Sequence, residues 1–432
     1  MIPAHGRSRD DVLAELRERQ ADDVDWRGGR VFSLVYHAGD AHEQLIKDAH
    51  GLYASANLLN PMAFAGLRSL ERDIVASAAT LFHGEGAVGA VTSGGTESIL
   101  CTVAAYRDRA RRTKPWLAWP ELVVPRTIHP AFDKAAHYFG VKLRKVDVDG
   151  EQRADVRAMA KAIGWRTIGL VASAPQYPHG VIDPIDEIGR LAERHHLPFH
   201  VDACVGGFVL PWLERLGRSV PRWDFRVRGV TSISADLHKF AYAGKGASLL
   251  LWRDLDRFRD QIFVATEFPG GIYASPTLLG TRPGGPIAAA WAALQAMGED
   301  GYLAATRRAI DAADRLRTGI RALGLTLLGR PDATIVAYTG DGLFAIADRL
   351  EARGWSVDRQ HRPTSIHLTV TANHAAVVDD YLADLRASLA EVRANPRLAR
   401  EGTAPMYGMA AKLPVRRLVA RNVRKMIAEL YK

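Results

Sequence analysis

The middle of the chain alternates short apolar runs, rich in β-branched residues, with segments of helical periodicity. Such alternation is typical of a mostly parallel sheet with helices on its faces. The runs expected to form strands cover residues 86–93, 121–126, 167–174, 198–204 and 230–236, and the helical segments between them cover 96–112, 130–139 and 184–196. In open sheets of this kind, ligands bind beyond the carboxyl ends of the strands. The residues that follow these runs are therefore the candidates for function.

The length of 432 residues is enough for one large core and a second, smaller one. A long helical stretch over residues 286–323 leads into a smaller α+β region with expected strands at 334–340 and 365–371. The Gly/Pro-rich segment 270–285 is too long for a simple connector and is expected to be a functional loop. We predict an N-terminal segment (1–60), a large domain (61–300), a small C-terminal α+β domain (301–400) and a tail (401–432).

Composition limits the class of protein. Apolar residues make up 47% of the chain and charged residues 24%, as in an ordinary globular protein. Two cysteines, Cys101 and Cys204, cannot form a disulfide framework, which favours a reducing compartment such as the cytoplasm. The first thirty residues are charged throughout and contain no apolar stretch long enough for a signal peptide or a membrane span.

Most of the net charge of +9 lies at the C-terminal end, where residues 391–432 hold ten Lys or Arg and three Glu. A charged tail on a nearly neutral body argues against a nucleic-acid-binding domain. Pro414 fits the first position of a helix. One face of that helix carries Val415, Leu418, Val419, Val423, Met426, Ile427 and Leu430. This face is expected to pack on the body or on a partner subunit, and peripheral contact with an anionic membrane is the main alternative.

Polar residues of complementary chemistry follow the expected strands. Ser93, Gly94, Gly95 and Thr96 open a helix, where free N–H groups and the helix dipole suit a phosphate. Asp202, two residues after His200, ends an apolar strand, where a buried carboxylate needs a cation or a strong donor. Taken singly, the glycine pair is also explained by steric needs, and Asp202 by a helix cap or a structural hydrogen bond.

A lysine follows the last of these strands. Lys239, directly after His238, lies at the mouth of an apolar sheet, where loss of hydration can make an amine nucleophilic. His129 is placed to lay an imidazole over the same crevice. A phosphate cradle, a buried carboxylate, a reactive lysine and a flat ring together meet the requirements of pyridoxal 5′-phosphate, whose aldehyde condenses with a lysine and whose ring nitrogen is kept protonated by a carboxylate. No metal is expected.

The segments VTSGGTESIL, HVDAC, ADLHKF, AGKG, GGIYASPT, GTRPGG, SIHLT and YGMA resemble those of the sphingosine-1-phosphate lyases. These enzymes belong to the fold type I superfamily of pyridoxal-phosphate enzymes and are akin to the group II amino-acid decarboxylases. The resemblance runs from about Tyr36 to Ala410, and the segment 270–285 is its most specific part. It implies a large domain with a mostly parallel seven-stranded sheet and a smaller C-terminal α+β domain.

The resemblance also implies roles for single residues. Lys239 carries the cofactor, Asp202 partners its ring nitrogen, and His129 stacks on its ring. The cofactor-binding set is completed by Ser93, Gly94, Gly95, Thr96, His200, His238 and Thr281, with Thr281 reaching the cofactor phosphate from the other subunit of a homodimer whose active sites are shared. The N-terminal segment, 1–60, contributes to the active site and to the dimer.

The implied reaction is a retro-aldol cleavage at C2–C3 of a phosphorylated sphingoid base, which gives phosphoethanolamine and a long-chain aldehyde. Lys245, between glycines, is expected to bind the substrate phosphate, and a solvated turn lysine is the alternative. Tyr177, Tyr36 and a released Lys239 are candidates to move protons, and the sequence does not choose among them. Either tyrosine is equally explained as an ordinary core or rim residue.

The chain departs from the family pattern at a few positions. The family tends to carry Asn-Pro-Leu-His where this chain has Asn57, Leu58, Leu59 and Asn60, so Asn60 replaces a histidine that can be cationic. Asn57 and Asn60 remain candidates for the substrate phosphate, with an altered affinity or pH dependence. Phe240 and Gly244 stand where Tyr and Pro are usual. The membrane span that precedes the eukaryotic members is absent, which favours a soluble bacterial-type member.

Two other interpretations compete with the lyase. An amino-acid decarboxylase would use the same lysine, aspartate and histidine but would need a cation for an α-carboxylate, and segment 270–285 and Lys245 argue against it. A non-catalytic protein that keeps the fold would have no need of the pair Lys239 and Asp202. We expect no nucleic-acid partner.

Overall fold

The computed structural model describes residues 2–395, 397–398 and 416–431 of the chain. A seven-stranded sheet forms its centre, with the strand order β1-β7-β6-β5-β4-β2-β3. The strands are β1 (Val88–Thr92), β2 (Glu121–Pro125), β3 (Lys142–Val146), β4 (Thr167–Ser173), β5 (Phe199–Asp202), β6 (Ser232–Ala235) and β7 (Ser248–Trp252). Pairs among β2 to β6 are parallel, whereas β7 runs antiparallel to both neighbours, β1 and β6. The predicted α/β fold with a mostly parallel seven-stranded sheet is confirmed.

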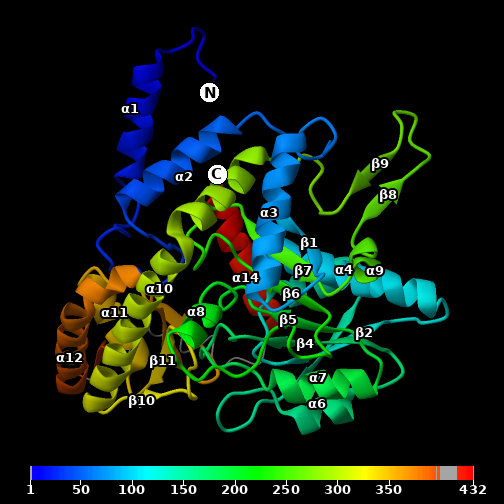
Figure 1. The fold of residues 1–432 in the computed structure, drawn as a ribbon. Helices are drawn as coiled ribbons and strands as arrows, with labels where there is room; N and C mark the ends of the chain where they lie inside the picture. Colours follow the sequence, from blue (N-terminus) through cyan, green and yellow to red (C-terminus); the bar gives the residue numbers. More distant parts are fainter. Residues whose placement is uncertain (1, 396, 399–415, 432) are drawn as a thin grey trace.

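Helices surround this sheet (Figure 1). They are α3 (Ala65–Leu81), α4 (Gly95–Thr113), α5 (Ala131–Phe139), α6 (Val156–Ala162), α7 (Ile185–Arg194), α8 (Leu210–Arg215) and α9 (Leu255–Arg259). Helix α7 shows why these segments are helical: Ile185, Ile188 and Leu191 recur every three residues and are buried, while the acidic residues of its first turn, Asp186 and Glu187, favour the helix N-terminus.

Two strands of the observed sheet, β3 and β7, were not among the strands expected from the sequence. Strand β3 lies at an edge of the sheet, and Lys142, Arg144 and Lys145 in it are exposed. An edge strand has one neighbour and does not need the continuous apolar run that marks a central one, so its sequence gives a weak signal. By contrast, every residue of β4, β5, β6 and β7 is buried.

Helices α1 (Arg9–Gln20) and α2 (Asp40–Leu52) precede the large sheet. Strands β8 (Phe263–Ala265) and β9 (Tyr273–Ser275) form an antiparallel hairpin. Figure 1 shows α1 and this hairpin projecting from the body on opposite sides. The expectation of a loop over 270–285 is therefore wrong in part, because Tyr273–Ser275 pairs with Phe263–Ala265 and the first turn of the next helix begins at Gly284.

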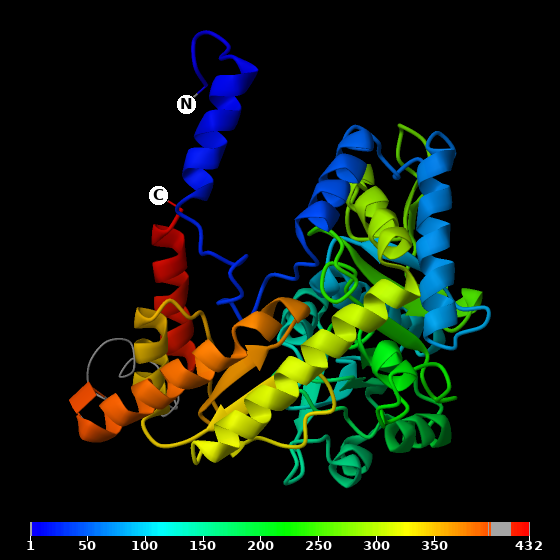
Figure 2. The ribbon, with the colours of Figure 1, turned by 60° about the vertical axis from the view of Figure 1, so that its left-hand side comes forward.

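Helix α10 (Gly284–Ala322) bends at Gly298, whose φ of 55° is one that residues with a side chain rarely adopt. Figure 2 shows it crossing from the large sheet to a smaller one. The smaller sheet is antiparallel, in the order β10-β11-β13-β12. Its elements are β10 (Thr326–Leu327), β11 (Ile335–Thr339), α11 (Leu343–Ala352), β12 (Asp358–Gln360), β13 (Ser365–Thr369), the 3₁₀ helix η1 (Ala372–Ala376) and α12 (Val378–Ala394). The two strands predicted for this region correspond to β11 and β13.

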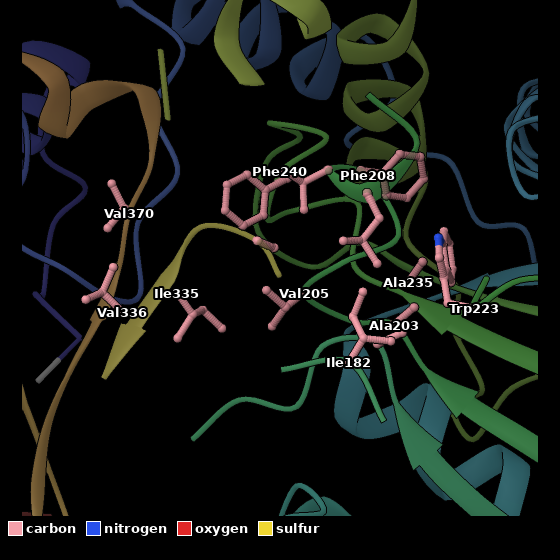
Figure 3. Packing of buried hydrophobic residues seen from close by; sticks show 14 of the residues in the cluster. Ile182, Ala203, Val205, Phe208, Trp223, Ala235, Phe240, Ile335, Val336 and Val370 are labelled. Carbon is pink, nitrogen blue, oxygen red and sulfur yellow. The ribbon is translucent and has the colours of Figure 1, made fainter. Parts of the chain in front are cut away.

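One hydrophobic core joins the two sheets. Ile335, Val336 and Val370 from the smaller part belong to the same buried cluster as Val205 and Phe240 from the larger part (Figure 3). Because the core is continuous, the small part holds a fixed position beside the carboxyl ends of the large sheet. The residue boundaries suggested for the domains stay predictions.

The apolar side chains of the second half of the C-terminal helix α14 (Arg416–Glu429) and just beyond it are not buried against the rest of the described chain. The exposed fractions are 47% for Val423, 55% for Met426, 44% for Ile427 and 75% for Leu430. Pro414, Val415 and the YGMA motif lie outside the described residues. None of the helices in the described part has the length and apolar composition that a membrane span requires.

Candidate active site

A cleft of about 570 Å³ lies beyond the carboxyl ends of the central strands. The strand register places Ser173 of β4 beside Asp202 of β5, and Asp202 beside Ser234 of β6, so these strand ends are level. Nine of the predicted site residues line the cleft: Ser93, Gly94, Gly95, Thr96, His129, Tyr177, Asp202, His238 and Lys239. The other predicted residues are not among those that line it: Tyr36, Asn57, Asn60, His200, Lys245 and Thr281.

Lys239 makes an ion pair inside the cleft that the sequence did not predict. Its Nζ lies 2.8 Å from Oδ2 of Asp236, and the side chains are 24% and 3% exposed. Burial disfavours the charge on Lys239, but its neighbours, Asp236 foremost, together outweigh burial and raise the pKa of the ammonium. Burial likewise opposes the charge on Asp236, and the charges of Lys239 and His238 overcome it and lower the pKa of Asp236. The signal in the sequence is a carboxylate one turn before the lysine, directly after an apolar strand.

Asp202 ends β5 and faces the cleft with 6% of its surface exposed. Its Oδ1 accepts hydrogen bonds from the backbone N–H of Cys204 (3.1 Å) and from Ser234 Oγ (3.4 Å). His200, fully buried beneath it, makes hydrogen bonds to Ser232 Oγ (2.9 Å) and Ser234 Oγ (3.1 Å). Burial lowers the pKa of His200 to about 4, so its ring is neutral and holds the serine that supports Asp202.

The turn from β1 into α4 has room only for glycine at one position. A Cβ on Gly95 would lie 2.6 Å from Oδ1 of Asp236 and 2.8 Å from Sγ of Cys204. The backbone of this first turn therefore passes close to Asp236, and a Cβ on Gly94 would lie 3.7 Å from Cε1 of His238. This turn is the positive end of the long helix α4, where the first N–H groups have no partner within the helix. Within the described residues, Nδ1 of His238 is buried and has no hydrogen-bond partner. An anionic group with acceptor oxygens fits this end of the cleft.

Glu97 is a second residue that the sequence analysis missed. It is 6% exposed, and its carboxylate accepts hydrogen bonds from the backbone N–H groups of Ser93 (2.6 Å), Leu278 (2.8 Å) and Leu279 (3.2 Å). These bonds hold Leu278 and Leu279 over the cleft, where both contribute to its lining. The signal available in the sequence is an acidic residue in the first turn of a helix whose residues 98–106 carry no charge.

Segment 280–283 is fastened to the N-terminal part of the same chain. Oδ1 of Asn57 accepts hydrogen bonds from the N–H groups of Arg282 (3.1 Å) and Leu59 (3.0 Å), and Arg282 pairs with Glu71. Oδ1 of Asn60 caps its own turn by accepting from the N–H groups of Met62 and Ala63, both at 3.2 Å. Thr281 is exposed and lies outside the cleft of its own chain.

Tyr177 connects the cleft to the smaller sheet. Its hydroxyl donates a 2.6 Å hydrogen bond to Oδ2 of Asp358 in β12, and its ring stacks on His367 of β13 at a centroid distance of 4.2 Å. Burial and the negative charge of Asp358 both raise the pKa of Tyr177, so it is a phenol at neutral pH. His129 also lines the cleft, and its Nδ1 accepts from the N–H of Ala131 (3.2 Å), which fixes the imidazole at the start of α5.

Lys245 lies next to the N-terminal segment. Its Nζ donates a 2.6 Å hydrogen bond to the carbonyl oxygen of Leu34 and lies 5.3 Å from the ring centroid of Tyr36. The side chain is exposed, but partial loss of hydration and the charge of Lys239 lower the pKa of Lys245 to about 8. Tyr36 packs edge-on against Phe240 at 5.1 Å, and burial raises the pKa of Tyr36 to about 12.

The residues present fit pyridoxal phosphate. A lysine and a buried carboxylate lie in one cleft, and a glycine-built cradle with an unpartnered histidine nitrogen forms its anion-binding end. Fold and site thus define a pyridoxal-phosphate-dependent enzyme. Residues 62–328 match the family described as the pyridoxal-dependent decarboxylase conserved domain, and pyridoxal phosphate is the cofactor.

Comparison with known proteins identifies the family within the pyridoxal-phosphate-dependent enzymes. The chain is 42% identical over 421 residues to the sphingosine-1-phosphate lyase of Arabidopsis thaliana, covering 95% of this chain and 77% of that protein. The solved structure of a sphingosine-1-phosphate lyase from Burkholderia pseudomallei superposes with a TM-score of 0.88 at 36% identity, covering 96% of this chain and 97% of that one. The chain belongs to the sphingosine-1-phosphate lyase family.

A more distant likeness concerns the fold alone. The glutamate decarboxylase of Lactobacillus brevis superposes with a TM-score of 0.78 at 20% identity and covers 90% of this chain and 94% of that one. The same fold therefore supports different reactions, and the residues of the site determine which reaction is catalysed.

Proposed function

We propose that this protein is a carbon–carbon lyase that cleaves sphingosine 1-phosphate and related phosphorylated sphingoid bases between C2 and C3. The products are phosphoethanolamine and a long-chain aldehyde. Family membership over nearly the whole chain supports this reaction, and the observation that carries it is the meeting of Lys239 and Asp202 in one cleft. When bound, pyridoxal phosphate stabilises the negative charge left at C2, because its protonated ring accepts those electrons.

Most of the cofactor-binding roles fall on residues that line the cleft. Lys239 attaches the cofactor, Asp202 keeps its ring nitrogen protonated, and His129 covers the ring face. The neutral His200 supports Asp202 through Ser234. The cofactor phosphate is held at the cradle by Ser93, Gly94, Gly95, Thr96 and His238. The lining of the cleft by these residues supports this assignment, as does Nδ1 of His238, which is buried and has no hydrogen-bond partner in the described part of the chain.

Proton transfer is assigned to groups at the open side of the cleft. Cleavage requires that the proton of the substrate 3-hydroxyl be removed and that C2 receive a proton. Tyr177, Tyr36 and Lys239 when released are the candidates. Tyr177 lines the cleft and its hydroxyl is already oriented by Asp358, which makes it the best placed of the two tyrosines.

The substrate phosphate is assigned to Lys245, with Asn57 and Asn60. Lys245 is an exposed cation beside the N-terminal segment, and its charge is coupled to that of Lys239. Asn57 lies beside Arg282, and neither asparagine is among the residues that line the cleft of the same chain. Their role therefore depends on a second subunit.

We infer a homodimer with shared active sites. Thr281 is exposed and outside its own cleft, and the neighbouring hairpin presents exposed apolar side chains, with Phe263 62%, Phe268 63% and Ile272 79% exposed. A second copy that covers these side chains would receive Thr281 at its own cofactor phosphate and place Asn57 and Asn60 near the neighbouring site. Sedimentation analysis tests this, with two chains per particle expected and a monomer at all concentrations contradicting it.

We further propose that α14 contacts anionic membrane, from which a lipid-derived substrate is drawn. The exposed apolar side chains of Val423, Met426 and Ile427 share a helix with the basic residues Arg421, Arg424 and Lys425. This combination favours the boundary between lipid headgroups and acyl chains. Both cysteines are free and buried, which supports a reducing compartment such as the cytoplasm.

The competing function is amino-acid decarboxylation, and product analysis separates the two. The full-length protein with pyridoxal phosphate is incubated with sphingosine 1-phosphate and, separately, with amino acids. We expect phosphoethanolamine and long-chain aldehyde from the first and no carbon dioxide from the second. Carbon dioxide from an amino acid without aldehyde from the phosphorylated base contradicts the proposal.

A further inference from the structure

The charge state of Lys239 before it carries the cofactor is set by a residue with no role so far. Asp236 is 3% exposed, and both of its oxygens are used: Oδ2 lies 2.8 Å from Nζ of Lys239, and Oδ1 accepts a 2.6 Å hydrogen bond from Ser248 Oγ. Nε2 of His238 lies 3.7 Å from the same Oδ2. The missing side chain of Gly95 leaves the room in which this carboxylate lies.

We propose that Asp236 is a positioning residue that holds Lys239 as an ammonium whenever no cofactor is attached to it, so that attachment begins only after Nζ has lost a proton to the solvent. The inference rests on the proposed role of Lys239. A buried carboxylate without a cation is costly, so the pair is maintained as long as the lysine is free.

The covalent step balances without any further reactant. A C=N bond forms between Nζ of Lys239 and the aldehyde carbon of the cofactor, and the C=O bond breaks. Two of the three ammonium protons leave with the oxygen as water, and the third stays on nitrogen. Only the uncharged amine has the electron pair that attacks the carbon, so one of these two protons first passes from Nζ to the solvent and is returned from the solvent to the departing oxygen.

Other titratable groups lie around Lys239, but none of them replaces Asp236 as its anionic partner. Tyr36 and Tyr177 have raised pKa values, and burial raises the pKa of Cys204 well above its usual range, so all three are neutral at neutral pH. Lys245 and His238 are further titratable neighbours, and burial lowers the pKa of both. The carboxylate of Asp202 lines the same cleft, but its hydrogen bonds come from Cys204 and Ser234. Asp236 is therefore the anion that pairs with Lys239.

The charge of Lys239 also decides which proton transfer this residue can perform during catalysis. During turnover the lysine is released from the cofactor, and its Nζ can return to Oδ2 of Asp236. A lysine kept as an ammonium can give a proton but cannot take one. Lys239 then acts as the proton donor to C2, and removal of the 3-hydroxyl proton falls to another group.

The test is the pH dependence of cofactor attachment in the full chain freed of cofactor. Pyridoxal 5′-phosphate is mixed with the wild type and with Asp236→Asn, and the change in visible absorbance gives the rate constant. In the wild type we expect a tenfold rise per pH unit through the neutral range. In Asp236→Asn we expect the rate constant to reach its plateau at a lower pH and to be about tenfold higher at neutral pH. The reason is that lowering the pKa of Lys239 by one unit raises the fraction of uncharged amine tenfold.

Asp260→Asn is the matched control, since Asp260 is also 3% exposed and ion-paired, with Arg109 and Arg112, outside the cleft. It should behave as the wild type. The same pH dependence in wild type and Asp236→Asn, or a slower reaction without a displaced plateau, overturns the proposal. Borohydride reduction and peptide mapping of each sample show whether Lys239 carries the cofactor, so failure of the proposed function is distinguished from failure of this inference.

A second measurement covers the case in which Asp236→Asn does not fold. Trace labelling of the wild-type protein with acetic anhydride, followed by peptide mapping, reports the reactivity of each lysine as a function of pH. We expect the reactivity of Lys245 to level off near pH 8, while that of Lys239 goes on rising. Levelling of Lys239 at or below the pH found for Lys245 overturns the proposal.

Discussion

The hydroxyl of Tyr177 donates a 2.6 Å hydrogen bond to Oδ2 of Asp358, and this bond joins the cleft of the large sheet to the edge of the small one. Asp358 also lies within 3.4 Å of the hydroxyl of Ser33, so the N-terminal segment meets the same carboxylate. Three parts of the chain that are distant in sequence are thus connected at the open side of the site.

The first prediction follows from the charge of Asp358. Its carboxylate raises the pKa of Tyr177, so Asp358→Asn lowers that pKa and moves the alkaline limb of the pH–rate profile to lower pH. Tyr177→Phe should lower kcat by about a hundredfold or more, the usual contribution of a general acid or base. Steady-state rates of aldehyde formation across pH check both. A limb that stays in place in Asp358→Asn contradicts the coupling.

Lys245 provides a second prediction, because its pKa of about 8 makes its charge depend on pH. The ammonium is present below pH 8 and is lost as the pH rises through that value. The KM for a phosphorylated substrate should therefore rise above pH 8, whereas an unphosphorylated analogue shows no such change. Lys245→Ala should raise the KM about ten- to a hundredfold at neutral pH, as expected for a hydrogen bond to a charged group.

Lys245→Arg is the control for this change, because a guanidinium stays charged throughout. It should remove the alkaline rise in KM without loss of phosphate preference. If Lys245→Ala discriminates between phosphorylated and unphosphorylated substrates as well as the wild type, the lysine has another role.

Glu97 provides a third prediction. Its carboxylate accepts three backbone N–H groups, and the single oxygen of a glutamine cannot serve all of them. Glu97→Gln should lower the free energy of unfolding by about 1–3 kcal/mol, the usual result of leaving a buried donor unpaired. Denaturant titration measures it, with the exposed Glu85→Gln as the matched control. Equal stability of both variants would show that the hydrogen bonds from Leu278 and Leu279 to Glu97 do not stabilise the fold.

The membrane proposal gives a fourth prediction. Replacing Arg421, Arg424 and Lys425 by glutamine removes three charges, each worth about 1 kcal/mol near an anionic surface, so affinity should fall about a hundredfold. Co-sedimentation with vesicles that contain phosphatidylserine measures the loss, and vesicles of phosphatidylcholine alone serve as the control. Equal binding of wild type and triple variant, or no binding of the wild type, excludes α14 as the contact.

The sequence predicts those parts of the site that lie where a buried strand ends. Asp202 and Lys239 follow apolar runs, so their place at the carboxyl edge of the sheet could be expected from periodicity and fold class alone. Asp236 and Glu97 could not be predicted in their roles, because each acts on groups that only the folded chain brings close. Glu97 meets the N–H of Leu278 across much of the sequence, and Asp236 meets Lys239 because the chain turns back after β6.

The fold shows the same limit. Strands β1, β2, β4, β5 and β6 carry apolar runs and were recognisable, whereas the buried strand β7 was missed and β3 is a charged edge strand. Strand β9 forms because Tyr273–Ser275 finds its partner in Phe263–Ala265. The resemblance supplied the seven-stranded sheet and the retro-aldol reaction. It could not supply the exposed face of α14, because the exposure depends on where the helix lies relative to the body.

The most direct test of the account is to locate the cofactor on the chain. The full-length protein loaded with pyridoxal phosphate is reduced with borohydride, digested, and mapped by mass spectrometry. We expect one modified residue, Lys239, and loss of both the modification and aldehyde formation in Lys239→Ala, with the fold retained. Attachment at Lys245 or at another lysine, or full activity of Lys239→Ala, would contradict it.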